Sequence, residues 1–223
     1  MIRRIYGSTG SLRRTAINLS LNRKTVVRKF RFLALESRFR LAVRNFTLPK
    51  AKSVEFDDLE TFEHTKCKPL SVTLAVETGT RRILGFEVSA MPVKGRLVEK
   101  AKRYGPRIDG RREARRRLFK RLSLLVEEGA DIKSDSNPHY PRDVKEFFPN
   151  SRHIQHLGKR GSDTGQGELK KVKFDPLFSV NHICAKMRAD INRLIRKTWC
   201  TTKDPERLSD HIAIFADNHN ASL

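Results

Sequence analysis

Two stretches of apolar and β-branched residues restrict the fold of this chain most strongly. The first reads SVEFDDLETF from residue 53, and the second reads PLSVTLAVETGTRRILGFEVSA from residue 69. Thr78-Gly79-Thr80 interrupts the second stretch with residues that favour a tight turn between antiparallel strands. The sequence therefore predicts three antiparallel strands.

Strands and helices alternate after this hairpin. ADIKSDSNPHYP predicts a short strand closed by a turn, PRDVKEFF a helix and SRHIQHL a second short strand. Two long helical patterns follow at 175–198 and 204–218. The first places apolar side chains three and four residues apart: Val180, Cys184, Met187, Ile191 and Leu194. The predicted fold class is α/β, with layers of helix on a sheet.

A basic segment lies between the hairpin and these elements. Residues 94–128 predict one or two helices, with Leu118, Leu122 and Leu125 as inward positions. Around them lie Arg111, Arg112, Arg115, Arg116, Lys120 and Arg121. The basic face is either a DNA contact or simply a solvated surface.

The N-terminal residues 11–34 predict a pair of helices. Ser11 and Asn22 can cap them, with the turn at Ser20–Leu21. The residues expected to converge between the helices are Leu12, Ala16, Leu19, Leu21, Val26 and Phe30. Outward-facing cations and short polar groups at the start of the second helix suit DNA phosphates and base edges. These residues are Arg23, Lys24, Thr25 and Arg28. A small all-α helix-turn-helix is predicted, and an ordinary amphipathic hairpin is the alternative.

The stretch from Arg38 to Lys52 is basic and weakly patterned, and Leu48-Pro49 disfavours helix. We therefore predict a connector there and a domain boundary near residue 50. Residues 1–50 would form the DNA-binding region and its linker, and residues 51–223 a second domain.

The charge of the chain indicates a polyanionic partner. Lys and Arg total 47 against 25 Asp and Glu, a formal net charge of +22. Such an excess attracts phosphate backbones, although a solvated basic surface is the alternative. Cys67, Cys184 and Cys200 are too far apart for a CxxC pair, and the sequence contains neither a secretory signal nor a long apolar run. These features predict a reducing, cytoplasmic location and no membrane segment.

Two aspartates are candidates for chemistry. Asp57 lies in the first predicted strand and Asp135, 78 residues later, ends another. Carboxylates brought together at strand ends repel each other unless divalent cations lie between them. Asp58 would point to the opposite face of an extended strand and is the weaker candidate. The alternative is that both aspartates are turn or cap residues.

Several segments resemble one family of DNA-recombining enzymes. EFDDLETF, IKSDSNPHYP and VNHICAKMRADINRLIRKTWCTTKDPERLSDHI, in that order after the helix pair, are similar to bacterial insertion-sequence transposases of the DDE superfamily, nearest the insertion-sequence-one-like group. The resemblance covers nearly the whole chain and rests mainly on RLIRKTWCTTKDPERLSDH. It implies a ribonuclease-H-like mixed sheet flanked by helices, and phosphoryl transfer with two Mg²⁺ or Mn²⁺ ions.

The resemblance also implies roles for particular residues. Asp57 and Asp135 match the first two acidic ligands, Asn181 occupies the position of the third, and Arg188 matches a basic residue seven positions later. Seven residues are about two helical turns, so Asn181 and Arg188 share a helix face. An asparagine carbonyl still ligates a hard cation, but more weakly than a carboxylate.

Other residues near these positions have alternative roles. If a third carboxylate is needed, Glu168 and Asp175 are the substitutes. His139 and His182 can orient substrate or move protons, but lone histidines more often satisfy local hydrogen bonds. Cys184 and Trp199 are interpreted as core residues.

The expected function is binding and metal-dependent cleavage of insertion-element ends, followed by strand transfer. The implied partners are double-stranded DNA, both terminal inverted repeats and target, and further copies of the chain. Family members carry a zinc-binding CxxC segment before the helix-turn-helix, whereas this chain begins MIRRIYG. A catalytically impaired, truncated DNA-binding relative that regulates or blocks transposition is therefore the alternative. A basic RNA-binding structural protein explains the charge but not the aspartates.

Overall fold

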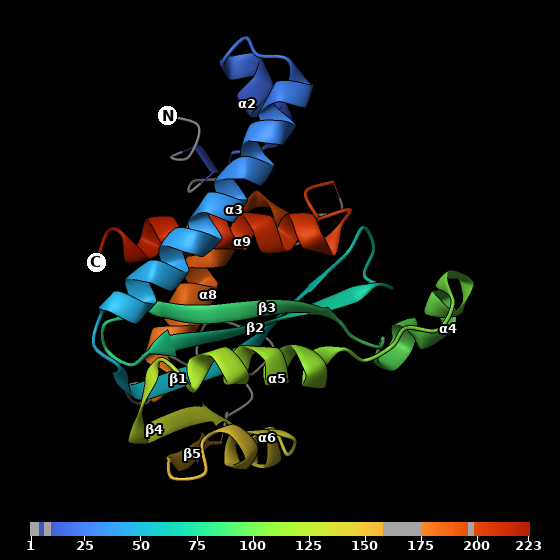
Figure 1. The fold of residues 1–223 in the computed structure, drawn as a ribbon. Helices are drawn as coiled ribbons and strands as arrows, with labels where there is room; N and C mark the ends of the chain where they lie inside the picture. The colour runs from blue at the N-terminus through green and yellow to red at the C-terminus, as the bar shows by residue number, and fades with distance from the viewer. Residues whose placement is uncertain (1–4, 7–9, 158–174, 196–198) are drawn as a thin grey trace.

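A central strand with neighbours of both orientations organises the fold. The computed structural model describes residues 5–6, 10–157, 175–195 and 199–223 (Figure 1). In chain order the elements are α2 (Leu12–Asn18), α3 (Arg23–Thr47), β1 (Ala51–Phe62), β2 (Pro69–Glu77), β3 (Ile83–Ala90), η1 (Gly95–Leu97), α4 (Val98–Ala101), η2 (Lys102–Tyr104), α5 (Arg111–Leu122), β4 (Val126–Asp135), α6 (Tyr140–Phe147), β5 (Arg152–His156), α8 (Phe178–Asp190), η3 (Asn192–Leu194) and α9 (Pro205–Asn220).

The five strands form one mixed sheet in the order β3-β2-β1-β4-β5. β1, β2 and β3 pair antiparallel, as the hairpin pattern predicts, with Gly79 at a φ of 84° in the β2–β3 turn. β4 and β5 run parallel to β1, and α6 connects them. The predicted α/β class and the β-α-β unit are confirmed.

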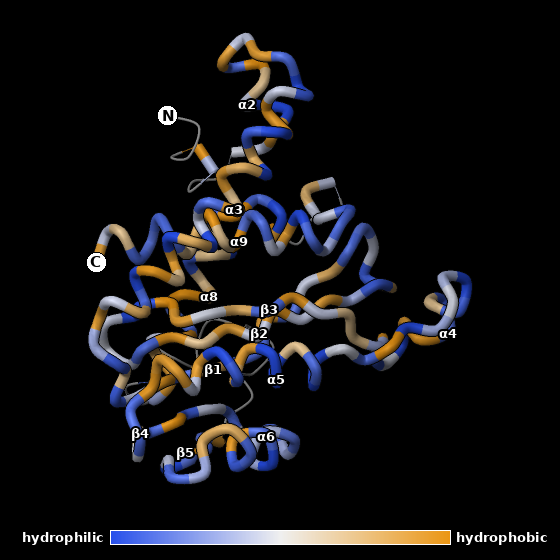
Figure 2. Tube along the Cα trace, in the orientation of Figure 1, coloured by the Kyte–Doolittle hydropathy of each residue, from blue (hydrophilic) through white to orange (hydrophobic). Residues whose placement is uncertain are grey.

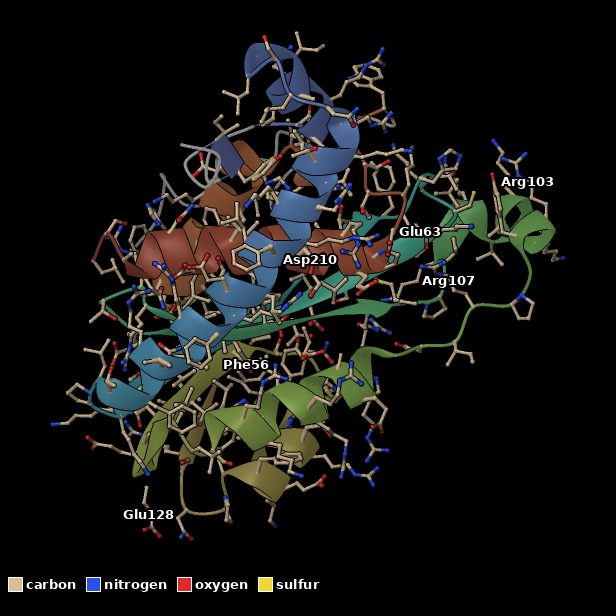
Figure 3. All side chains as sticks on the ribbon, turned by 45° about the horizontal axis from the view of Figure 1, so that its top comes forward. Phe56, Glu63, Arg103, Arg107, Glu128 and Asp210 are labelled. Carbon is tan, nitrogen blue, oxygen red and sulfur yellow. The ribbon has the colours of Figure 1, made fainter. Side chains whose placement is uncertain are left out.

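Helices cover both faces of this sheet (Figure 1). On one face α5 and α6 enclose an aromatic cluster in which Phe56 of β1 lies 5.0 Å from Phe119 and 4.8 Å from Tyr140, measured between ring centroids. Figure 3 labels Phe56 on this side of the sheet. On the other face α8 packs its apolar side chains on β1 and β2, and α9 packs on β3. The tube in Figure 2 is mostly hydrophobic along β2 and β3, which are enclosed between these layers.

The predicted connector at 38–52 is wrong, because α3 continues as one helix to Thr47. Its second half packs on α9, where Arg38 and Arg44 form ion pairs of 3.1 Å with Asp210 and Asp217. Figure 3 labels Asp210 beside α3. The Asn45 amide donates to the Ile83 carbonyl of β3 at 3.1 Å. Tertiary contacts thus maintain a helix where the local pattern is weak.

The N-terminal helix pair has the predicted caps. Ser11 accepts a hydrogen bond from the Arg14 N–H and Asn22 accepts one from the Lys24 N–H. Ser20, at a φ of 50°, forms the turn between α2 and α3 in a conformation that usually favours glycine. Leu21 was expected between the helices but is 39% exposed, because it belongs to this turn and not to either helix.

Three boundaries differ from the sequence-based expectations. The basic segment 94–128 contains one longer helix, α5, and its last residues already belong to β4. The predicted helix 175–198 extends only from Phe178 to Asp190. Trp199 therefore lies in a turn with 75% of its surface exposed, so its interpretation as a core residue is wrong. Within the described residues, every helix is too short or too polar to cross a membrane.

Candidate functional site

Asp57 and Asp135 lie on neighbouring central strands. β1 and β4 pair in parallel with Glu55 opposite Lys133, an offset of 133 − 55 = 78 residues. The same offset separates Asp57 from Asp135 (135 − 57 = 78), so the register brings them to one level of the sheet. Side chains at equivalent positions of adjacent parallel strands project from the same face, with the strands about 4.8 Å apart. The two carboxylates therefore face the same small region.

The electrostatics of Asp57 reflect this proximity. Burial is the main reason that the pKa of Asp57 rises to about 6. The carboxylates of Asp135 and Asp58 also raise it, whereas the backbone N–H of Asp58 and the cation of Arg188 lower it. A half-buried carboxylate with a like-charged neighbour is stabilised by an added cation. This is the property expected of a ligand for a divalent metal ion.

Asp58 faces the other side of the sheet, as the alternation in β1 predicts. The Thr73 hydroxyl donates to Asp58 Oδ1 at 2.5 Å, and Arg115 Nη1 lies 3.9 Å from Asp58 Oδ2. Asp58 also lines a pocket of about 410 Å³ between α5 and α6, together with Arg112, Asp143 and other polar residues. These partners give Asp58 a structural role. Of the two adjacent aspartates, Asp57 is therefore the candidate metal ligand.

The helix α8 crosses the face that carries Asp57. Glu55, two residues before Asp57 on the same face, is buried, and its Oε2 accepts the Val180 N–H at 3.0 Å. One turn later, burial and the Asp57 charge raise the pKa of the Cys184 thiol to about 12. Arg188 lies close enough to lower the pKa of Asp57. The first turns of α8 and Arg188 are thus held over the carboxylate.

Asn181 lies on this helix but is held by a different partner. Its amide Nδ2 donates to Asp175 Oδ2 at 2.8 Å, while Asp175 Oδ1 accepts the Leu177 N–H at 3.0 Å. Among the described residues, no hydrogen bond joins Asn181 to Asp57 or Asp135. The bond to Asp175 uses the amide nitrogen, whereas the carbonyl oxygen is the atom that can ligate a cation.

A metal ion would suit the pair of aspartates. Mg²⁺ takes one or two carboxylates and completes its shell with water and substrate oxygens. In the described part of the chain, no group of three His, Cys, Asp or Glu residues could hold a metal ion. The candidate ligand set is of another kind, because its third member is the amide of an asparagine. The negative charges of its two aspartates fit a divalent cation. Asp175, the substitute carboxylate, is bonded to Asn181, and Glu168 lies outside the described residues.

The residues proposed to contact DNA are exposed at the start of α3. This set is Arg23, Lys24, Thr25 and Arg28. The basic helix α5 differs, because acidic neighbours already pair with much of its charge. Arg116 pairs with Glu146, and both Arg117 and Arg121 pair with Glu87. The beginning of α3 is therefore the stronger candidate for a DNA contact.

The two histidines differ in their surroundings. His182 Nε2 lies 3.5 Å from Arg81, and burial together with that cation lowers its pKa. His139 is exposed at the rim of the pocket lined by Asp58.

Sequence reasoning missed Glu55, although an acidic residue two positions before Asp57 in an apolar strand was a visible signal. It also missed the pairing of Arg115 with Asp143, for which the sequence gives no signal.

No family model matches the chain, and no curated protein matches it in sequence.

Proposed function

We propose that the chain is a DNA transposase that binds insertion-element ends and catalyses metal-dependent cleavage and strand transfer. The observation that carries this proposal is the shared level and face of Asp57 and Asp135 on β1 and β4. A half-buried pair of carboxylates in a chain of net charge +22 combines a cation site with attraction for a polyanion.

We further infer a ribonuclease-H-like fold for the sheet and its flanking helices. The mixed strand order, with β1 central and helices on both faces, supports it. The α2–turn–α3 unit supports a helix-turn-helix in front of this sheet, because two capped helices joined by a short turn present exposed cations at the start of the second helix.

The proposed chemistry consists of two phosphoryl transfers. First, a water oxygen attacks a phosphorus at the element end, the bond to the 3′ oxygen breaks, and that oxygen takes a proton. The resulting 3′-OH then loses its proton and attacks a phosphorus of target DNA, the bond from that phosphorus to its 3′ oxygen breaks, and this oxygen takes up a proton. Divalent cations bound by the aspartates would activate the attacking oxygen and stabilise the leaving one.

The residues of the chain supply positioning and charge for both steps. Asp57 and Asp135 hold the cation site on two adjacent strands, which keeps its geometry fixed. Asn181 would contribute its carbonyl oxygen, since its bond to Asp175 uses only the amide nitrogen. Arg188 would neutralise the phosphate that enters beside Asp57. Arg23 and Lys24 would contact the backbone of the inverted repeat.

The test is cleavage and joining of DNA that carries the sequences flanking the coding region, with Mg²⁺ or Mn²⁺. We expect Asp57→Ala, Asp135→Ala and Asn181→Ala to abolish the products. Asp131→Ala is the matched control, since Asp131 lies on the same strand β4 but pairs on the surface with Arg152. Binding of the ends without cleavage by the native chain, even after Asn181→Glu, would contradict an enzymatic role.

The second candidate is a DNA-binding relative that occupies element ends and blocks an intact transposase. The bond from Asn181 to Asp175 favours it, because it gives this side chain a partner within the protein itself. In that case the native chain would bind the ends in a salt-sensitive manner and would reduce cleavage by an active transposase.

A further inference from the structure

The helix α3 carries a second apolar face in addition to the one that packs on the protein. Phenylalanine recurs at every seventh position, at Phe32, Phe39 and Phe46, and Leu35 and Val43 lie between them. Their exposed fractions are 60%, 69%, 63%, 70% and 45%, respectively. We call these five residues the phenylalanine stripe.

Most of the stripe points away from the rest of the molecule, and Phe46 at its end also lines a groove with Phe86 and Leu124. The buried residues of the same helix are Val26, Phe30, Ala34, Ser37, Leu41 and Asn45. At about 100° per residue, the mean directions of these two sets are roughly opposite. Along α3 in Figure 2, hydrophobic and hydrophilic residues alternate throughout the helix. One face packs on α9 and, at Asn45, contacts β3, whereas the stripe is exposed to solvent.

We propose that the phenylalanine stripe binds the same stripe of a second copy of this chain, with the two α3 helices parallel. A repeat of seven residues is the period that keeps one helix in contact with another along its length. Single exposed apolar residues are normal, but a continuous row of this kind indicates an interaction site. The α3 helix of a second copy presents an identical row of apolar side chains, so it can cover the stripe without any other protein.

The size of the stripe is sufficient for a dimer. The three phenylalanines can bury about 150–250 Å² each and the smaller Leu35 and Val43 somewhat less, so the five side chains, exposed by roughly 60%, offer about 500–600 Å² per copy. Both copies together would bury on the order of 1,100 Å², which exceeds the roughly 1,000 Å² expected of a specific interface.

The flanking charges favour the parallel orientation. When two helices meet along the phenylalanine stripe, Arg31 flanks the contact on one side of each helix. Glu36, five residues later, flanks it on the other side. In parallel helices this spacing brings Arg31 of one copy to Glu36 of the other, in both directions. An antiparallel pair centred on Phe39 would instead bring the two Arg38 side chains together. Glu36 pairs with Arg40 of its own chain at 2.6 Å, and the two oxygens of a carboxylate can bind more than one cation at a time.

The dimer also has a consequence for DNA binding. This consequence rests on the proposed function, whereas the dimer itself does not. In Figure 1 the first half of α3 projects beyond α9 and carries α2 at its end. Parallel pairing would place the two starts of α3, with Arg23 and Lys24 of each copy, at the same end of the assembly. Two DNA segments would then be bound side by side.

Sedimentation velocity of the full chain in about 0.3 M salt tests the interface without DNA, because salt at this level screens the self-repulsion of the net charge. We expect a dimer, and we expect Phe39→Glu to raise its dissociation constant at least ~100-fold, since two carboxylates would meet in an apolar contact. Ile108→Glu is the control, because Ile108 is 86% exposed outside α3 and should leave the dimer intact.

Orientation is tested by oxidation of cysteine substitutions at the two ends of the stripe, introduced into a Cys200→Ser background because native Cys200 is partly exposed, whereas Cys67 and Cys184 are buried. Phe32→Cys and Phe46→Cys should each form cross-linked dimers with themselves. Cross-linking only between the two variants in a mixture would indicate antiparallel helices and overturn the proposal. A native chain that stays monomeric up to about 100 µM would also overturn it, given the area above. Neither readout involves DNA cleavage, so a failed interface and a failed catalytic site remain distinguishable.

Discussion

The substitution Arg115→Met removes the partner of a buried carboxylate beneath the candidate site. Arg115 and Asp143 have side chains that are 4% and 2% exposed, and Arg115 Nη2 lies 2.6 Å from Asp143 Oδ2. Breaking such a pair from one side leaves an uncompensated charge and typically costs about 3–5 kcal/mol. Arg112, whose Nε lies 3.7 Å from Asp143 Oδ1, compensates only in part.

Protonation of Asp143 sets a ceiling on this cost. Neutralising a carboxyl of reference pKa 3.9 at pH 7 takes about 4 kcal/mol, and at pH 5 only about 1.5 kcal/mol. The loss of stability should therefore be about 3–4 kcal/mol at pH 7 and clearly smaller at pH 5. In the variant, the uncompensated buried charge is relieved in acid, so the stability of the variant relative to the native chain recovers as the pH falls.

Urea unfolding at both pH values measures these differences. The control Arg117→Met removes an exposed cation from the same helix and should cost less than ~1 kcal/mol. The double variant Arg115→Met with Asp143→Leu should recover most of the loss, because no buried charge remains. A double variant as unstable as the single one would refute the reasoning and would indicate lost packing, for example of Arg115 on the Tyr140 ring.

Three further predictions concern other parts of the molecule. Burial lowers the pKa of His211 to about 4, so its contribution to stability is present above pH 6.5 and is lost as the pH falls towards 4, by about 3 kcal/mol in full. In urea titrations across this range, His211→Gln should show a weaker pH dependence than the native chain. Replacing Arg23 and Lys24 by Ala should weaken duplex binding and reduce the slope of log K against log salt by about 2, with an unchanged melting temperature; an unchanged slope would rule out both phosphate contacts. Asn22→Ala should cost about 1 kcal/mol in chemical unfolding through loss of the α3 cap, and a neutral effect would show that the cap adds nothing.

The strands were predictable because β-branched runs and a turn at Gly79 are local signals. The caps at Ser11 and Asn22 were predictable for the same reason. The length of α3 was not, since its buried face includes Ser37 and Asn45, whose environment is created by α9 and β3. Polar residues on a buried face weaken the helical pattern that sequence reasoning uses.

The candidate site was predictable only in part. The sequence gives the spacing of 78 residues between Asp57 and Asp135, but its meaning depends on the register of β1 and β4, which follows from packing of the whole sheet. The bond from Asn181 to Asp175 depends on how α8 begins, and the pattern of the sequence placed that start too early. Trp199 was misjudged because the helical period was extended beyond the end of the helix.

The most direct test of the central claim is a calorimetric titration of the protein with Mn²⁺ near pH 7.5, where Asp57 is ionised. The account predicts saturable binding that is lost in Asp57→Asn and in Asp135→Asn and strengthened in Asn181→Glu, while Asp131→Asn binds as the native chain does. Binding that is absent in the native chain, or that is equally strong in all four variants, would contradict a metal site formed by these residues.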